Sequence, residues 1–422
     1  MSKVLIITVG VGERVEHAIC CSIRQHNPEY IVLMCTEKSR DEKLPLILAD
    51  KNVAGRKYNP VIIKDENDVE HVRQVTLKTI NELLNSYDSS DIAIDYTSGT
   101  KSMSAGVVIA GLERRIGSLI YIYGTRNKNG RVISGTEKII SFEPNRTYVE
   151  YLFREAINSF NSWRFDVCLQ QLKEASSLVL EPVVIDKIDI LERLAKGYSF
   201  WDCFNLEEAF HILDGLELQN NFLREWGIKS KIEKNKEFLY KESKNKFCIE
   251  RGIDLFENAQ RRAMEYKFDD AVARLYRCLE YIAQLKIFER GLYSALGKEV
   301  DTENLDIDKL PSSLKDKYIK KKDERDGKIR LGIYEDYQLL FLLDDPLGKL
   351  FMDDFGTDGL NQLLSIRNSS ILAHGFSPVK EEVYKKMLNK TKKFLETLLP
   401  NTEDLLTKAN FPRLKIVNSL FD

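Results

Sequence analysis

The hydrophobic pattern of the chain changes once, near residue 146, and this change limits the folds that it can adopt. Before that point, short runs rich in β-branched and aromatic residues alternate with amphipathic stretches. The predicted strands are 4–8, 30–35, 61–63, 92–96 and 119–123, and the predicted helices are 15–25, 44–51, 69–84 and 102–115. Short apolar strands separated by helices are typical of a mostly parallel sheet covered on both faces. The first part of the chain is therefore predicted to be an open α/β domain.

The rest of the chain is predicted to be helical. After a turn-rich segment at 124–130 and a last strand at 138–142, apolar residues recur at i, i+3 and i+4 spacing. Helices are expected at 148–160, 165–178, 185–200, 206–216, 221–247, 249–264, 268–288, 334–343, 359–366 and 381–399. A charged stretch at 311–330 interrupts them. We therefore predict an α/β domain at 1–146, a helical connector at 147–248 and an all-α domain at 249–422.

Composition excludes several classes of protein. The 63 lysines and arginines nearly balance the 65 aspartates and glutamates, so the formal net charge is −2. A histone-like binder of polyanions is thereby excluded, and any polyanion must be held by a local pocket. No apolar run approaches the ~20 residues that span a bilayer, and no signal-peptide core forms at the start. Seven scattered cysteines without a C-x-x-C pair and five dispersed histidines indicate a cytoplasmic protein without a structural metal.

The loop richest in polar donors runs from Asp95 to Gly106, between a predicted strand and a predicted helix. Ligands of open α/β sheets bind at the carboxyl ends of strands. A helix N-terminus there offers free backbone N–H groups to an anion. The alternative is an ordinary Ser/Thr helix cap. The loop is not a nucleoside-triphosphate P-loop, because no glycine stands five positions before Gly99. Its candidate ligand-binding residues are Thr97, Ser98, Gly99, Thr100, Lys101 and Ser102.

A second loop with glycines follows the first predicted strand. Gly10 and Gly12 are the first two glycines of a G-x-G-x-x-G fingerprint, but Val15 stands where the third should be. Nicotinamide or flavin binding is therefore only weakly supported. Both glycines still allow close approach of the backbone to a ligand, and a loop before the last strand is a candidate third wall. The further candidate ligand-binding residues are Thr8, Gly10, Gly12, Gly135 and Thr136.

Another polar constellation lies at Ser365–Phe376 and contains Arg367, Asn368 and His374. Arg367 and His374 are seven residues apart and therefore share one helical face. A histidine that moves protons, beside an arginine that neutralises a phosphate, is the minimum equipment for RNA cleavage without a metal. The alternative is that His374 and Gly375 only end a helix. A continuous helix would separate Arg367 and His374 by ~10 Å along its axis, which does not favour their direct cooperation within one protomer.

These segments resemble a known pair of domains. The run from Thr97 to Gly106 is similar to the nucleotide-sensing signature of CARF domains, the Rossmann-like sensors of CRISPR defence. The run from Arg367 to Gly375 resembles the R-N-x5-H form of the HEPN ribonuclease motif, and Phe268–Arg277 resembles the first core helix of HEPN domains. The order of sensor, connector and nuclease, and the total length, resemble the type III CRISPR-associated CARF–HEPN ribonucleases.

The resemblance implies a homodimer whose sensor domains bind a cyclic oligoadenylate and whose HEPN domains cut single-stranded RNA without a metal. Arg367 would bind and polarise the scissile phosphate, His374 would act as the acid–base, and Asn368 would orient one of them. The loop signature resembles that of tetra-adenylate sensors, so the tetra-adenylate is the expected activator. No cofactor, membrane contact or stable DNA complex is expected. Some CARF domains slowly cleave their activator, and no feature of this sequence decides whether Thr100 and Lys101 do so.

Two other functions are compatible with a ligand-binding α/β domain joined to a helical region. A non-enzymatic ligand sensor could use its helical domain to bind a partner or nucleic acid, but no basic recognition helix is visible near the C-terminus. A nucleotide-metabolising enzyme would be expected to carry a full Walker or dinucleotide motif, which is absent. The run Lys320–Asp326 within the charged stretch is either a solvated surface insertion or a basic lip beside an RNA-binding cleft.

Overall fold

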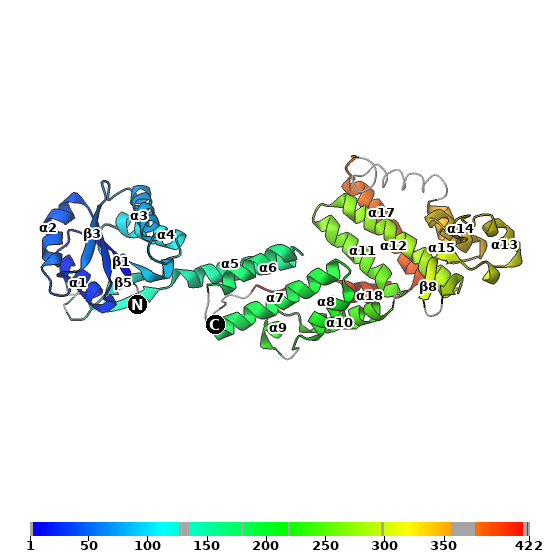
Figure 1. The fold of residues 1–422 in the computed structure, drawn as a ribbon, viewed down its shortest axis with the longest axis horizontal. Coiled ribbons are helices and arrows are strands. Elements are labelled where there is room, and N and C mark those ends of the chain that lie inside the picture. Colours follow the sequence, from blue (N-terminus) through cyan, green and yellow to red (C-terminus); the bar gives the residue numbers. More distant parts are fainter. Residues whose placement is uncertain are drawn as a thin grey trace. The chain divides into compact units, whose positions relative to one another are not determined.

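The predicted fold class, an α/β domain followed by a helical region, is confirmed by the computed structural model (Figure 1). The chain forms two compact units, the first made of residues 1–153 and 174–181 and the second of residues 154–173 and 182–422. The structure describes residues 3–125, 128, 133, 135–178, 181–217, 220–245, 247–296, 299–355, 376–416 and 420. No helix in these ranges is long and apolar enough to cross a membrane.

A six-stranded sheet is the centre of the first unit. Its strands are β1 (Val4–Val9), β2 (Tyr30–Cys35), β3 (Lys57–Ile62), β4 (Ile92–Asp95), β5 (Ser118–Tyr123) and β6 (Lys138–Phe142). They follow the order β3-β2-β1-β4-β5-β6, and only β6 runs antiparallel to its neighbour. The central strands β1 and β4 pair in parallel, with Ile7 opposite Asp95. Their carboxyl ends therefore meet at one edge of the sheet.

Helices cover both faces of this sheet, as Figure 1 shows. On one face, α1 (Val15–His26) and α2 (Glu37–Leu48) pack on Leu5 and Ile7 of β1. On the other face, α3 (Val69–Leu83) and α4 (Lys101–Glu113) pack on Val4 and Ile6. Successive side chains of β1 thus enter two hydrophobic cores, which explains why every residue of this strand except Thr8 is apolar.

Two predicted boundaries in the first unit are wrong. The helix expected at 44–51 begins at Glu37, because Thr36 accepts a hydrogen bond from the Ser39 backbone and the Ser39 hydroxyl accepts one from the Thr36 backbone. This reciprocal cap starts the helix before its apolar residues appear. Strand β3 begins four residues before the expected 61, because it is an edge strand whose first three residues are exposed and polar or aromatic.

The second unit is helical, and α5 (Pro144–Asn161) and α6 (Phe165–Ser176) have residues in both units. Its other helices are α7 (Pro182–Asp202), α8 (Leu206–Asp214), α9 (Asn221–Glu225), α10 (Lys229–Lys244), α11 (Ile249–Met264), α12 (Phe268–Glu289), α13 (Ser312–Ile319), α14 (Ile333–Leu342), α15 (Pro346–Asp354), α17 (Glu381–Leu398) and α18 (Thr402–Ala409). A hairpin of β7 (Tyr293–Leu296) and β8 (Glu299–Leu305) follows α12. Helices α11 and α12 pack side by side, and α12 also contacts α14 and α17.

Several of these elements differ from the expected ones. The helix predicted at 221–247 is divided into α9 and α10 by Gly227, which has a φ of +73°. The β7–β8 hairpin was not predicted, and neither were α15 and α18. The charged stretch contains α13, and its cations form ion pairs, as in Arg330 with Asp326 inside the stretch and Lys321 with Glu335 of α14. The helix predicted at 359–366 lies outside the described residues.

Three helices of the second unit end in the same turn, each time on an aromatic residue. Trp163, Phe204 and Tyr266 have φ values of 57°, 59° and 61°, in the left-handed region that favours glycine. In each turn the following N–H donates to a carbonyl five residues earlier, as from Lys267 to Arg262 at 3.0 Å. This is the Schellman pattern of helix ends. Three bulky side chains therefore occupy positions where glycine is the residue of least strain.

Candidate functional site

The candidate ligand loops meet where the strand order of the sheet reverses. From β1 the chain continues to β2 on one side, and from β4 it continues to β5 on the other side. Such a switch point leaves a crevice at the carboxyl ends of the two central strands, and ligands of open α/β sheets bind there. The loop that contains Gly10 follows β1, and the Thr97–Ser102 loop follows β4. The topology thus brings the two sets of predicted residues to one place.

Direct contacts hold these two loops together. The Thr8 hydroxyl donates a hydrogen bond to the Ser98 carbonyl oxygen and lies 3.4 Å from the Asp95 carbonyl oxygen. Gly10 lies against Gly99, so closely that a Cβ on Gly10 would be 2.7 Å from the Gly99 nitrogen. Gly99 has a φ of +93°, which only glycine adopts readily. Both glycines are therefore required by the geometry of the loops.

Asp95 holds the Thr97 loop in place through a hydrogen bond to its backbone. Its side chain is almost completely buried, and its Oδ1 accepts a hydrogen bond from the Thr97 backbone N–H at 2.9 Å. Burial raises the pKa of this carboxyl, and the hydrogen bonds of Thr97 oppose that shift. The Thr97 hydroxyl accepts a hydrogen bond from the backbone N–H of Ile122 in β5 at 2.8 Å. The structure thus adds Asp95 to the site, although the sequence analysis named it only as the start of the loop.

Thr100 is the N-cap of α4. Its hydroxyl oxygen accepts a hydrogen bond from the Met103 N–H at 3.1 Å and donates to the Glu66 carbonyl oxygen at 2.6 Å. The cap that the sequence analysis considered as an alternative is therefore present at this residue. A hydroxyl that makes both bonds holds the loop in place and ties it to the segment after β3.

Lys101 and Ser102 form the first turn of α4. The Lys101 side chain is exposed, and Ser102 is half-buried. Within the described part of the chain, the backbone N–H groups of these two residues donate no hydrogen bond. An exposed cation and two free N–H groups at the positive end of a helix are suited to bind an anion.

Gly135 and Thr136 lie in the loop between β5 and β6, at the same edge of the sheet. Gly135 has a φ of +88°, and its N–H donates to Glu137 Oε2 at 2.6 Å. The Thr136 hydroxyl donates to the Ile133 carbonyl oxygen at 2.6 Å. Glu137 Oε1 lies 3.4 Å from Nε2 of His17 in α1. This contact ties the loop to α1, the helix that follows Gly12. Gly12 itself is exposed.

The predicted catalytic residues Arg367, Asn368 and His374 lie outside the described residues, so the structure tests none of their roles. The described chain resumes at Phe376. There the Val379 N–H donates to Asp269 Oδ1 at 3.3 Å, which ties this segment to the first turn of α12. Among the described residues, no group of three or more His, Cys, Asp or Glu side chains is placed to hold a metal ion.

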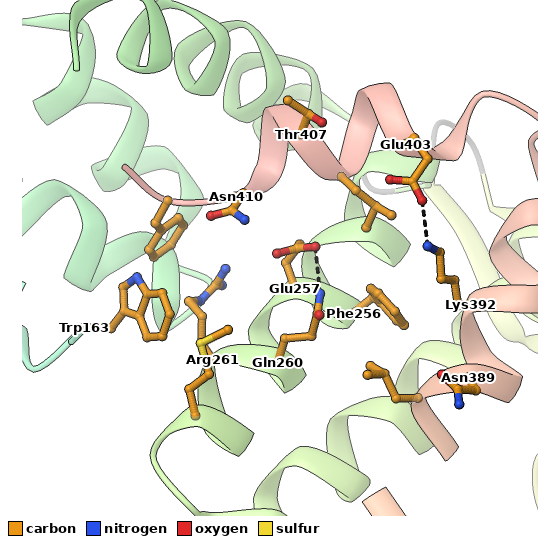
Figure 2. Close-up of a pocket in the computed structure, with 14 residues that line it drawn as sticks. Trp163, Phe256, Glu257, Gln260, Arg261, Asn389, Lys392, Glu403, Thr407 and Asn410 are labelled. Atoms are coloured by element: carbon orange, nitrogen blue, oxygen red, sulfur yellow. Dashed lines mark hydrogen bonds and ion pairs between the residues drawn. The ribbon is translucent and has the colours of Figure 1, made fainter. Parts of the chain in front are cut away.

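Helix α11 carries an ionic network that joins it to α7. Arg261 Nε is 2.7 Å from Oδ1 of Asp202, and Arg261 Nη2 is 3.3 Å from Oδ1 of Asp254. Burial raises the pKa of Asp254 to about 6. Arg261 also lines a cleft of about 430 Å³ that is bordered by α11, α17 and α18 (Figure 2). Glu257 and Gln260 lie side by side in this cleft, joined by a hydrogen bond of 2.8 Å.

Comparisons with known proteins agree with this arrangement. Residues 240–398 match the family model of the Csm6 HEPN domain. The fold is similar to that of Enterococcus italicus Csm6 bound to cyclic hexa-2′-fluoro-hexa-dAMP, with a TM-score of 0.63, 12% sequence identity and 95% of each chain covered. No curated protein matches this sequence. The predicted resemblance to CARF–HEPN proteins is thereby confirmed for the HEPN region by the family model, and for the fold by the similarity to the Csm6 structure.

Proposed function

We propose that this protein is a cyclic oligoadenylate-activated endoribonuclease of type III CRISPR defence. The proposal is supported by its Csm6-like fold and by its match to the Csm6 HEPN domain. The observation that carries this proposal is the position of the R-N-x5-H motif. Arg367 and His374 fall within residues 240–398, which match the Csm6 HEPN domain. The N-terminus of α4, which would bind a phosphate, lies at the switch point of the other unit.

The activator is proposed to bind at the carboxyl ends of β1 and β4. Lys101 and the free N–H groups of α4 would hold its phosphates, while Gly10 and Gly99 would let the backbone approach it. The remaining members of the predicted ligand set are Thr8, Gly12, Thr97, Ser98, Thr100, Ser102, Gly135 and Thr136. The sequence favours the tetra-adenylate as activator, whereas the similar structure is bound to a cyclic hexa-adenylate analogue.

Cleavage is proposed to need no metal ion. The ribose 2′-hydroxyl would attack its own phosphodiester, His374 would move the protons, and Arg367 would stabilise the developing negative charge. Asn368 would orient one of these two groups. Because a continuous helix would separate Arg367 from His374 by ~10 Å along its axis, the site would be completed by the same residues of a second protomer. The working form would therefore be a homodimer in the cytoplasm, with single-stranded RNA as its substrate.

A fluorescent single-stranded RNA tests this proposal directly. The full chain is incubated with it in EDTA, alone or with cyclic tetra-adenylate or cyclic hexa-adenylate. Cleavage is expected with one of the two messengers and not without it, and His374→Ala is expected to abolish it. Activity that requires magnesium, or that persists in the His374 variant, would overturn the mechanism. Binding of a messenger without any cleavage would instead favour a non-enzymatic sensor.

A further inference from the structure

Two clefts lie along α11 and share part of their lining. One is the cleft of about 430 Å³ in Figure 2, and the other has a volume of about 540 Å³ and lies toward the C-terminal end of the helix. Trp163, Gln260 and Met264 line both. We call the two clefts together the α11 groove. All the residues that line it belong to the second unit.

Exposed hydrophobic side chains stand at the end of this groove. Tyr266 is 82% exposed and Met264 is 56% exposed. Tyr266 also has the left-handed backbone conformation that favours glycine. Trp163 has the same conformation, but its ring is buried and contributes to packing. The Tyr266 ring adds little to packing, with Phe268 as a T-shaped neighbour at 6.3 Å. A strained, exposed aromatic residue of this kind indicates a contact with another molecule.

The charges of the α11 groove favour an anionic partner. Arg413 lines it, with its guanidinium 5.3 Å from the centroid of the Trp163 ring, and no carboxylate in the described part of the chain pairs with it. The two exposed carboxylates of the lining are each neutralised by a lysine, Glu381 by Lys385 at 2.7 Å and Glu403 by Lys392 at 2.6 Å. The buried Glu257 has a pKa raised to about 7 by desolvation, so it is partly protonated near neutral pH.

The groove also lies in the region of the sequence that carries the predicted catalytic motif. Helices α11 and α17, which border it, and the residues Arg367 and His374 all fall within residues 240–398, which match the Csm6 HEPN domain. Tyr266 lies in the turn between α11 and α12, inside the same range.

We propose that the α11 groove binds the single-stranded RNA substrate of the HEPN region. An unpaired base would stack on Tyr266, and a phosphate would lie beside Arg413. Aromatic rings next to cations are the common means of holding a single strand without reading its sequence. The inference rests on the proposed function for the identity of its ligand. A second copy of the chain is the competing occupant.

A labelled 2′-O-methyl oligonucleotide measures this binding, because without a 2′-hydroxyl it cannot be cut by the proposed mechanism. Fluorescence anisotropy with Tyr266→Gly is expected to show an affinity about ten-fold lower, the effect of losing one stacked base. The melting temperature of this variant should stay equal or rise, because glycine relieves the backbone strain. Tyr266→Phe should bind like the native chain. Phe204→Gly is the matched control, since it makes the same change in the same turn outside the groove.

Arg413→Met tests the phosphate contact. It should also lower the affinity, and it should reduce the slope of log affinity against log salt by about 0.7, the value for one phosphate of a single strand. Native affinity in both Tyr266→Gly and Arg413→Met would overturn the proposal. So would conversion of these variants from dimer to monomer, because the groove would then bind a second copy. If the chain cuts no RNA but the variants still lose oligonucleotide affinity, the proposed function fails and the groove assignment stands.

Discussion

Gly10 and Gly99 meet backbone to backbone across the switch point of the sheet, where a Cβ on Gly10 would stand 2.7 Å from the Gly99 nitrogen and 3.1 Å from its Cα. Both are backbone atoms of Gly99, so neither can move aside as the end of a flexible side chain could. The contact therefore couples the loop after β1 to the loop before α4. It also explains why the predicted ligand residues of two distant segments form one site.

Gly10→Ala is expected to displace the Thr97–Lys101 loop, because the added methyl group overlaps the Gly99 backbone. Activator binding should weaken about ten-fold or more, the effect of moving the binding groups by a fraction of an ångström. The rise in melting temperature on adding cyclic tetra- or hexa-adenylate measures this. Gly332→Ala is the control, since a Cβ there meets nothing within 4 Å. If the Gly10 variant shows the native thermal shift, the contact between Gly10 and Gly99 is not needed for activator binding.

Thr100→Val removes both hydrogen bonds of the cap while keeping the shape of the side chain. Loss of an N-cap lowers stability by about 1 kcal/mol, so the transition of the first unit should move to a lower temperature. Thr100→Ser retains the hydroxyl and should restore the native value. Circular dichroism on heating is the measurement. If the valine and serine variants melt together, the hydroxyl contributes nothing to the stability of α4.

Lys101→Met separates ligand binding from folding. A cation at the N-terminus of a helix opposes the helix dipole, so its removal should leave stability unchanged or slightly increase it. The activator concentration for half-maximal RNA cleavage should nevertheless rise, with the maximal rate unchanged. Titration of cleavage against messenger concentration distinguishes the two effects. An unchanged half-maximal concentration would show that Lys101 does not bind the activator.

Glu257 predicts a pH dependence of stability. Burial raises its pKa from 4.5 to about 7, so the folded chain binds this proton more tightly than the unfolded chain. Its contribution to stability is therefore lost as the pH rises from about 4.5 to about 7. Glu257→Gln retains an acceptor for Gln260 and removes the buried charge.

The glutamine variant should be more stable than the native chain at pH 8, by up to on the order of 3 kcal/mol, and equally stable near pH 4. Urea unfolding at both pH values provides the comparison. Glu403→Gln, at an exposed carboxylate, should change stability little at either pH. Equal stability of native and Glu257→Gln chains at pH 8 would show that this carboxyl is not destabilised by burial.

The sequence located most of the sheet because its strands are buried on both faces. The range predicted for β2, residues 30–35, is the observed one, and β1 differs from its prediction by one residue. Prediction was wrong where the pattern of burial gives no signal. The early start of β3 lies at an exposed edge, and the start of α2 depends on the cap between Thr36 and Ser39. The cap of α2 and the pairing of β3 with β2 decided these boundaries, and hydrophobic periodicity indicates neither of them.

The sequence by itself also determined the fold class and the residue types at the ligand loops, because periodicity and short motifs are properties of local segments. Only the tertiary structure decided which of these segments meet. The register of β1 against β4 brought Gly10 to Gly99 and placed Asp95 beneath Thr97. Likewise, the packing of α11 gathered Trp163 and Arg413, which are 250 residues apart, around one groove. Such contacts depend on how distant elements pack, and a single sequence read along its length carries no direct signal of them.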